Sequence, residues 1–354
     1  MKKYYILGIM SGTSLDGLDL AYCCFERENN RWKYHVICST TISYPKEIKE
    51  RLANAIHCSG LELTQLDIEL GQFIALAVNT FLTGKEPIPD WIASHGHTVF
   101  HQPTKGITLQ IGNGAVIAIM TEIPVVCDFR IMDVALGGQG APLVPIGDAL
   151  LFSDYPICLN LGGFSNISFD HKGKREAFDI SPCNLPLNRL ACERNLEFDM
   201  NGMIAMIGKI DTSLLEQLNN LDFYQQLAPK SLGLEWLQSC FFPLLDNCQL
   251  SLEDKMCTVT EHIAMQIANV IQPLEGDNVL VTGGGAKNRY LIERLKNHTQ
   301  KKITIPDTQT IDYKEAIIFA FLGLLKILGE INTLASVTGA SKNSSGGVIY
   351  KINF

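Results

Sequence analysis

Apolar runs that end in glycine-rich polar turns recur along the chain, and they predict strands joined by tight turns. The first run, residues 4–9, leads into a polar turn at 11–17, and apolar residues resume at Leu18. The Asp-Gly pair inside this turn is a strong hairpin signal. A second segment, 157–169, repeats the order of apolar residues, Gly-Gly, Ser-Asn and apolar residues. The two copies predict two similar hairpins, and therefore two similar lobes.

Between the strands, apolar residues recur at helical spacing, which predicts an α/β fold. The segment 137–145 is rich in glycine and proline, and we expect the chain to cross between lobes there. Lobe I is expected to span 1–140, rejoined by 340–354, and lobe II to span 141–339. A last short strand, 348–352, fits either lobe. Helices are expected over 45–55, 63–81, 115–120, 186–194, 213–217, 254–271 and 316–328.

The composition is that of a globular chain. It has 354 residues, 46% hydrophobic and 19% charged, which is enough for two medium lobes with their own cores. The net charge is −8 and no basic cluster is longer than a Lys-Lys pair, so nucleic acid is not an expected partner. No apolar run approaches the roughly 20 residues of a membrane helix. The eleven cysteines, an odd number without a CxxC pair, favour a reducing cytoplasm.

The first turn carries more donors than a hairpin needs. Its glycines let the backbone approach a ligand, and its hydroxyl side chains suit phosphate oxygens: Ser11, Gly12, Thr13, Ser14 and Gly17. Asp16 is placed to hold Mg²⁺ through water. A polar surface turn explains the same residues equally well.

A third glycine turn consists of Gly283, Gly284 and Gly285. It follows the apolar strand at 278–282 and precedes an amphipathic helix. A strand, glycines and a helix N-terminus in this order are typical of an anion and nucleotide site. Neither the P-loop pattern nor the GxGxxG fingerprint occurs.

Nine segments, in order along nearly the whole chain, resemble the anhydro-N-acetylmuramic acid kinase family of the actin/Hsp70/sugar-kinase superfamily. They are GIMSGTSLDGLDLA (8–21), SHGHTVFHQP, DFRIMDVALGGQGAPLVP (128–145), LNLGGFSNIS, FDISPCN, PKSLGLEW, VTGGGAKN, EAIIFAFL and VTGA. The resemblance implies a two-lobed actin-like ATPase (ribonuclease H-like) fold, with duplicated lobes around a nucleotide cleft. It also implies ATP and Mg²⁺ as cofactors and a small sugar as substrate.

The resemblance also implies roles for particular residues. Phosphate binding falls to Ser11, Gly12, Thr13, Ser14, Asp16, Gly17, Asp19, Gly162, Gly163, Asn166, Gly283, Gly284 and Gly285. Sugar binding falls to His95, His97, Arg130, Asp133, Asn184 and Glu315.

The residues themselves leave alternatives open. His95, His97 and His101 could bind zinc, line a sugar pocket or be core histidines with satisfied hydrogen bonds. Arg130 could pair with a sugar carboxylate, or with Asp128 or Asp133 in an ion pair. Glu315 could bind the sugar, or be a helix N-terminal glutamate that the helix dipole favours.

The reaction implied by the family has two steps. A water molecule, activated by an aspartate, attacks C1 of 1,6-anhydro-N-acetylmuramic acid and opens the anhydro bridge. The released O6 then takes the γ-phosphate of ATP, which gives N-acetylmuramic acid 6-phosphate. The resemblance places this base at Asp179, between the apolar Phe178 and Ile180. A turn aspartate that caps the helix from Pro186 is the alternative.

The chain departs from the family beside this aspartate. The usual Thr-Gly-Pro-Gly-Asn reads Ile-Ser-Pro-Cys-Asn at 180–184. If either lost glycine required a positive φ, Ser181 or Cys183 would strain or reshape the loop.

The leading hypothesis is therefore a cytoplasmic kinase of peptidoglycan recycling. The alternatives are a nucleotide-switched ATPase like actin or Hsp70, and a catalytically altered relative that binds muramyl sugars as a sensor. A homodimer is left open. Closure of the lobes on ligands is expected, with hinges near 137–140 and 336–347.

Overall fold

The chain forms two compact units in the computed structural model, which describes residues 2–12 and 15–352. Unit 1 comprises the residues up to 152 and those from 313 onward, and unit 2 comprises 153–312. These divisions differ from the expected boundaries after 140 and 339. The reason is α13, whose residues from Tyr313 on pack within unit 1. Gly147 packs closely against α13, since a Cβ there would lie 2.6 Å from Ile318. The chain up to 152 therefore belongs to the same unit as that helix.

The described part of unit 1 holds a seven-stranded sheet in the order β12-β6-β4-β1-β2-β3, with β5 paired to β4. The first three strands are antiparallel neighbours, whereas β4 runs parallel to β1 and β6 parallel to β4. The last strand pairs with β6, which assigns the end of the chain to unit 1. The strands are β1 (Lys3–Ser11), β2 (Leu18–Glu28), β3 (Arg31–Ile42), β4 (Trp91–Gln102), β5 (Ile107–Ile111), β6 (Val125–Cys127) and β12 (Val348–Tyr350).

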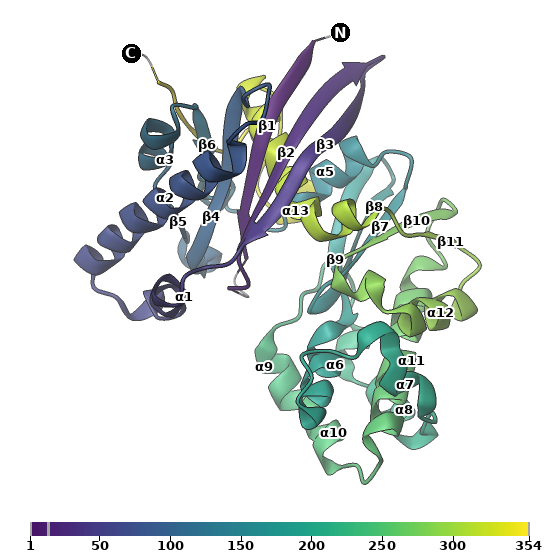
Figure 1. Cartoon of the computed structure of the whole chain (residues 1–354). Coiled ribbons are helices and arrows are strands. Elements are labelled where there is room, and N and C mark those ends of the chain that lie inside the picture. Colours follow the sequence, from purple (N-terminus) through teal and green to yellow (C-terminus); the bar gives the residue numbers. More distant parts are fainter. Residues whose placement is uncertain (1, 13–14, 353–354) are drawn as a thin grey trace. The chain divides into compact units, whose positions relative to one another are not determined.

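Helices cover both faces of this sheet (Figure 1). Leu7 and Ile9 of β1 pack with apolar residues of α2 and α3. Gly8, between them, faces α13, and a Cβ there would lie 1.9 Å from the carbonyl oxygen of Ala316. Alternate residues of a strand point to opposite faces, so glycine at this position lets α13 lie against the strand. The helices are α1 (Lys46–Ala53), α2 (Gly60–Leu82), α3 (Gly114–Thr121), α4 (Ile131–Ala135), α5 (Val144–Leu151), α13 (Thr308–Ile327) and α14 (Ala335–Thr338).

Unit 2 repeats the topology of the first sheet. Its five strands are ordered β11-β10-β7-β8-β9. The first three along the chain are antiparallel neighbours, β10 runs parallel to β7, and β11 runs parallel to β10. This matches the β6-β4-β1-β2-β3 part of unit 1, which is the strand order of a ribonuclease H-like fold. The duplication predicted from the two hairpins is therefore confirmed. The strands are β7 (Ile157–Leu161), β8 (Phe164–His171), β9 (Lys174–Pro182), β10 (Asn278–Thr282) and β11 (Lys302–Thr304).

The core of unit 2 centres on α11, which is buried along most of its length. The helices of this unit are α6 (Asn184–Ala191), α7 (Met203–Ile207), α8 (Thr212–Asn219), α9 (Leu234–Trp236), α10 (Phe242–Asn247), α11 (Leu252–Ile271) and α12 (Arg289–His298). Within the described residues, no helix has the length and apolar character needed to cross a bilayer.

Capping residues set helix starts that apolar spacing alone places too late. The Ser59 hydroxyl accepts from the Glu62 amide while the Glu62 carboxylate accepts from the Ser59 amide, so α2 begins at Gly60 instead of 63. The Ser251 hydroxyl accepts from the Asp254 amide at 3.1 Å, so α11 begins at Leu252 instead of 254.

Acid should destabilise unit 2 through His262. Its Nδ1–H donates to Asn219 Oδ1 (2.6 Å) and its Nε2 accepts from the Tyr224 hydroxyl (2.7 Å), so the neutral ring is satisfied. Burial lowers the pKa of His262 to about 3, whereas unfolded histidine titrates near 6.5. The stability from the neutral ring is therefore complete above about pH 6.5 and is lost as the pH falls toward about 3.

The difference between the two pKa values corresponds to a decrease in the free energy of unfolding on the order of 4 kcal/mol between about pH 6.5 and about pH 3. Urea unfolding of the parent and His262→Gln at pH 7 and pH 4.5 measures it, with exposed His57→Gln as the control. We expect the pH dependence to shrink only in His262→Gln. An equal pH dependence in all three proteins would contradict the assignment.

Candidate active site

Asp179 lies on a β-bulge of β9 in unit 2. Ser165 of β8 pairs with Ser181, but the next residue, Asn166, pairs with Asp179, which leaves Ile180 as an extra residue in β9. Such a bulge bends the strand and re-aims its side chains, and bulges are frequent next to active sites. The extra Ile180 is 1% exposed, so its packing in the core fixes the bulge.

One oxygen of the Asp179 carboxylate is held and the other is open. Oδ2 accepts a hydrogen bond from the Leu232 amide (2.9 Å), and the Asp179 amide donates to the Lys230 carbonyl (3.0 Å). Within the described residues, Oδ1 has no hydrogen-bond partner. Burial raises the pKa of Asp179, against the opposing effect of the Leu232 amide. This is the environment of a general base. The capping alternative is wrong, because α6 begins at Asn184 and Cys183 occupies its N-cap position.

The altered loop after Asp179 does not need a left-handed residue. Neither Ser181 nor Cys183 has a positive φ, and Cys183 has φ −136° and ψ −94°. Ser181 continues β9, where its backbone amide donates to Ser165 Oγ at 3.2 Å and its hydroxyl lies 2.9 Å from the same oxygen. The loss of the two family glycines is therefore accommodated without a positive φ at either position.

Asn184 links the glycine turns of unit 2. Its backbone amide donates to the Gly162 carbonyl (3.1 Å), and the Cys183 amide donates to the Gly163 carbonyl (2.9 Å). Its side chain donates to the Leu161 carbonyl (3.0 Å) and lies so close to Gly285 that a Cβ there would be 3.0 Å from Asn184 Oδ1. Both glycine turns follow parallel strands, β7 and β10, so they meet at the same edge of the sheet.

The third glycine turn differs from the prediction in one respect. Gly283 has φ +81°, and a Cβ there would lie 2.6 Å from Asn160 Oδ1, so only glycine fits. A short 3₁₀ turn, Gly284–Lys287, follows before α12 begins at Arg289. The Asn288 side chain caps α12 by accepting from the Leu291 amide at 3.1 Å. The helix N-terminus is therefore separated from the glycines and already capped.

In unit 1, the hydroxyl of Ser11 belongs to the core. It accepts from the Tyr44 hydroxyl (2.7 Å) and lies 3.0 Å from Nδ1 of His97, to which it donates. Ser11 is 2% and His97 4% exposed, and burial lowers the pKa of His97. The Ser11 hydroxyl is therefore engaged inside unit 1, and the phosphate-binding role of Ser11 stays a prediction. His97 likewise follows the core-histidine alternative, because its ring is enclosed and faces Ser11.

The remaining described residues of the first turn differ in exposure. Asp16 is exposed, Gly12 is half-buried and Gly17 is buried. Asp19 lies at the start of β2, where its Oδ1 accepts from the Thr41 hydroxyl at 2.6 Å. The predicted phosphate residues Thr13 and Ser14 lie outside the described residues.

Arg130 is held by two contacts that leave part of its guanidinium open. Its Nε donates to His95 Nε2 (2.9 Å) and its Nη1 donates to the Gly140 carbonyl (2.7 Å). His95 Nδ1–H donates to the Gly96 carbonyl (2.8 Å), which makes Nε2 the acceptor. Burial, and then the charge of Arg130, place the pKa of His95 well below its usual value. With both nitrogens engaged, His95 has none left for the zinc of the metal alternative.

Burial lowers the pKa of Arg130 to about 10, so the guanidinium stays charged at neutral pH. Within the described residues, no ion pair joins it to Asp128 or Asp133, so the structural alternative for Arg130 is not realised. Its outer nitrogen, Nη2, has no partner in that part of the chain.

Asp133 is buried and hydrogen-bonded within unit 1. It is 1% exposed, and its two oxygens accept from the Gly140 amide (2.7 Å) and the Thr338 hydroxyl (2.7 Å). The contact ties the VTGA segment to the loop that holds Arg130. Both oxygens already accept hydrogen bonds inside the protein, and the sugar-binding role of Asp133 stays a prediction.

Glu315 lies inside a helix. Because α13 begins at Thr308, seven positions earlier, the helix-dipole alternative is wrong. Its side chain is exposed, but surrounding protein raises its pKa, while the charges of Arg130 and Lys314 lower it. Asp19 also acts on Glu315, so the two carboxylates and Arg130 lie in one region of unit 1.

Comparison with known proteins decides the family. The pattern described as "Anhydro-N-acetylmuramic acid kinase" matches residues 3–352. A protein of that name from Sulfurovum sp. is 34% identical over 99% of this chain and 100% of its own length. The chain belongs to the anhydro-N-acetylmuramic acid kinase family. A relative of the same name from Vibrio cholerae is 36% identical, over 99% of this chain and 98% of its own. A glucokinase of the ROK family from Streptomyces griseus, solved with glucose and AMPPNP, aligns over 90% of this chain and 99% of its own, with a TM-score of 0.43 and 10% identity.

Three residues that hydrogen-bond to predicted site residues were not identified from the sequence motifs. Tyr44 holds Ser11, Thr338 holds Asp133, and the Leu232 amide holds Asp179. Thr338 and Leu232 stand inside the matching segments VTGA and PKSLGLEW, which was the available signal. Tyr44 lies in none of them, and only the tertiary contact identifies it.

Proposed function

We propose that this protein is an ATP-dependent kinase that opens 1,6-anhydro-N-acetylmuramic acid and phosphorylates its O6. Water adds its oxygen to C1 as the bond from C1 to the bridging oxygen breaks, and that oxygen, now O6, takes the γ-phosphoryl group of ATP. The products are N-acetylmuramic acid 6-phosphate and ADP. The proton of the attacking water goes to Asp179, whose open Oδ1 is the observation that carries this assignment.

Asp179 is prepared for this step by its surroundings. The bulge at Ile180 aims the side chain, and the Leu232 amide fixes one oxygen without neutralising the other. The raised pKa strengthens the carboxylate as a base. A water molecule bound at Oδ1 would be oriented and partly deprotonated as it attacks.

The glycine turns support a role in binding the phosphates of ATP. Gly162, Gly163 and the 283–285 turn gather around Asn184 in unit 2, and the β1–β2 turn is their counterpart in unit 1. The assignments of these glycines, of Asn166 and of Asn184 rest on the family motifs.

Mg²⁺ fits this arrangement. No group of three metal-ligating side chains occurs within the described residues, and Mg²⁺ usually needs only one or two carboxylates besides phosphate oxygens and water. Asp16 and Asp19 are the residues that would hold it. When bound with ATP, the ion neutralises charge on the phosphates.

We place this activity in the cytoplasm and in cell-wall recycling. The eleven cysteines are all unpaired, which suits a reducing compartment. The sensor alternative rested on the altered 180–184 loop, and neither Ser181 nor Cys183 in that loop has the positive φ that would favour glycine. A homodimer and closure of the units on ligands stay predictions.

Mass spectrometry tests the proposed function directly. The purified protein, incubated with ATP, Mg²⁺ and 1,6-anhydro-N-acetylmuramic acid, should form a sugar whose mass rises by one water and one phosphoryl group. Glucose under the same conditions should stay unchanged. Release of ADP without a phosphosugar would contradict the proposal and favour an ATPase.

Arg130→Lys should weaken sugar binding about tenfold or more and leave ATP affinity unchanged. The planar guanidinium can hold His95 and Gly140 while presenting a further nitrogen to the lactyl carboxylate, whereas an ammonium has no such fork. Calorimetry with the sugar and, separately, with a non-hydrolysable ATP analogue measures both affinities. Equal sugar affinity in both proteins would assign Arg130 to structure alone.

A further inference from the structure

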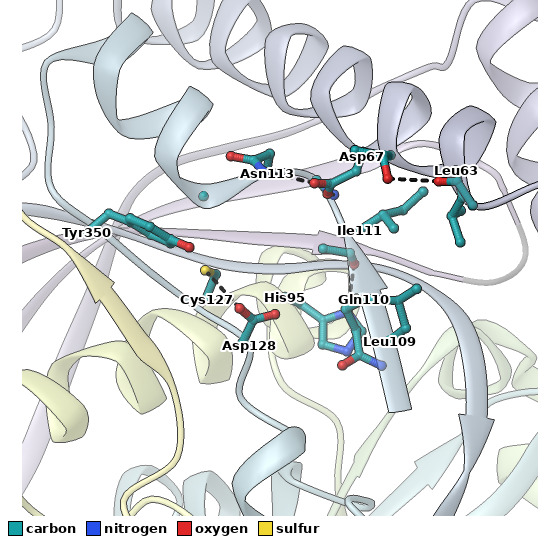
Figure 2. A pocket seen from close by; sticks show the side chains of 15 residues that line it. Leu63, Asp67, His95, Leu109, Gln110, Ile111, Asn113, Cys127, Asp128 and Tyr350 are labelled. Atoms are coloured by element: carbon teal, nitrogen blue, oxygen red, sulfur yellow. Dashed lines mark hydrogen bonds between the residues drawn. The ribbon is translucent and has the colours of Figure 1, made fainter. Parts of the chain in front are cut away.

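Unit 1 contains a pocket of about 340 Å³ beside Arg130. The N-terminal part of α2, the middle of β4, the ends of β5 and β6 and the last strand, β12, form its walls (Figure 2). Its volume is at the lower end of the range for small-molecule sites. All its lining residues belong to unit 1, so the pocket is complete within that unit.

The lining combines apolar walls with a few hydrogen-bonding groups. Leu63, Leu109 and Ile111 supply apolar surface, and amide, imidazole, carboxylate and phenol groups supply polar contacts. No lysine or arginine is among the described residues that line it. Without a cation in its walls, the pocket disfavours phosphate and carboxylate groups and suits a neutral polar ligand.

Two polar groups in the pocket are available to a ligand. Figure 2 shows the Asp128 carboxylate and the Tyr350 hydroxyl directed toward its interior. Within the described residues, the only hydrogen bond of the Asp128 carboxylate comes from the weakly donating Cys127 thiol at 3.7 Å, and the Tyr350 hydroxyl has none. By contrast, Asp67 is engaged, because its two oxygens accept from the Gly112 amide and the Asn113 side chain, each at 2.8 Å.

Asp128 is also conformationally unusual. Its φ is +56°, in the left-handed region that costs energy for a side chain other than glycine. The residue follows β6 directly and precedes Arg130 by two positions, so this turn directs the carboxylate into the pocket while the guanidinium contacts His95. Burial raises the pKa of Asp128.

His95 connects the pocket to Arg130. The imidazole lines the pocket, and its Nε2 accepts from Arg130 Nε at 2.9 Å. A ligand in the pocket is therefore one side chain away from the guanidinium. Muramic sugars carry their anionic group, a lactyl carboxylate, apart from the neutral acetamido and hydroxyl groups of the ring. This separation matches a pocket without a cation that lies next to the Arg130 guanidinium.

We propose that this pocket binds the acetamido and hydroxyl groups of the amino-sugar substrate, with Asp128 and Tyr350 as partners, while Arg130 takes the lactyl carboxylate. The assignment rests on the proposed function and adds the residues that recognise the neutral part of the sugar. The Asp128 carboxylate accepts hydrogen bonds from ring hydroxyls or the amide N–H, and the leucine and isoleucine side chains contact the acetamido methyl group.

Two sugars and three variants test this assignment by calorimetry without ATP. The sugars are 1,6-anhydro-N-acetylmuramic acid and 1,6-anhydro-N-acetylglucosamine, which lacks the lactyl carboxylate. Asp128→Asn should weaken binding of both about tenfold, since hydrogen bonds to a charged acceptor are among the stronger ones. Arg130→Lys should weaken only the sugar with the carboxylate. Asparagine tolerates the left-handed backbone, so Asp128→Asn should keep the fold.

Thr64→Trp provides a steric test, because Thr64 is an exposed α2 residue that lines the pocket. Thr80→Trp is the matched control: both threonine hydroxyls donate to the carbonyl four residues earlier at 2.8 Å, and Thr80 is exposed outside the pocket. We expect Thr64→Trp to weaken both sugars more than tenfold and Thr80→Trp to bind as the parent does.

Unchanged affinity for both sugars in Asp128→Asn and Thr64→Trp would overturn the pocket assignment even if the parent makes phosphosugar. Conversely, these variants could lose sugar binding while the parent makes no phosphosugar. That result would support the pocket assignment and overturn the proposed kinase reaction. Since binding is measured without ATP, the two failures are distinguishable.

Discussion

Asp179→Asn is expected to reduce phosphosugar formation by about 10²- to 10⁴-fold, the range for loss of a general base. An amide cannot take a proton from water at neutral pH. The asparagine side-chain oxygen can still accept the hydrogen bond from the Leu232 amide, and the bulge is fixed by buried Ile180, so the fold should persist. Rates measured by coupled ADP release and by mass spectrometry of the phosphosugar check this.

The control for this variant is Asp170→Asn in the neighbouring strand. Asp170 is a largely exposed carboxylate whose ion pair with Arg175 spans 3.3 Å, and it should turn over like the parent. The parent's kcat/KM should rise with pH through the raised pKa of Asp179, and this acid limb should vanish in Asp179→Asn. A variant rate within about tenfold of the parent would move the base to another residue.

Lys314→Met should lower the free energy of unfolding of unit 1 by about 3–5 kcal/mol, because it removes one member of a buried ion pair and keeps the other. Lys314 Nζ lies 2.7 Å from Asp148 Oδ1, and the two side chains are 7% and 5% exposed. The pair joins α13 to α5, and Lys314 Nζ also lies 5.3 Å from the ring centre of Phe152. Denaturant unfolding followed by circular dichroism measures the effect.

Two further variants isolate the cause. Lys46→Met removes a lysine whose pair with Glu50 spans 3.8 Å between side chains 88% and 63% exposed, and its effect should stay within about 0.5 kcal/mol. Replacing both buried partners, Lys314→Met with Asp148→Leu, should recover most of the stability, since no uncompensated charge remains. A loss below about 1 kcal/mol in Lys314→Met would contradict the buried-pair account.

The units and most elements followed from local patterns. The hairpins at 11–17 and 162–163 predicted the duplication, because glycines and an Asp-Gly pair between apolar runs restrict the chain to tight turns. The family segments placed Asp179 at the end of the second hairpin, where β9 carries it. Boundaries were less well predicted: the units divide after 152 and 312, because α13 packs against the Gly8 face of the first sheet and not with its sequence neighbours.

The sequence by itself determined the fold class, the family and the identity of the aspartate proposed as base, since these depend on residue types and their spacing. Only the tertiary structure decided which polar side chains are buried and hydrogen-bonded within the protein. Ser11 is paired with Tyr44 and His97, and Asp133 is paired with Thr338 and the Gly140 amide. Asp128 is left with only a weak thiol partner beside a pocket. The surroundings of these carboxylates come from residues distant in sequence, which no local pattern brings together. Thr338 donates to Asp133, and Tyr350 lines the pocket with Asp128.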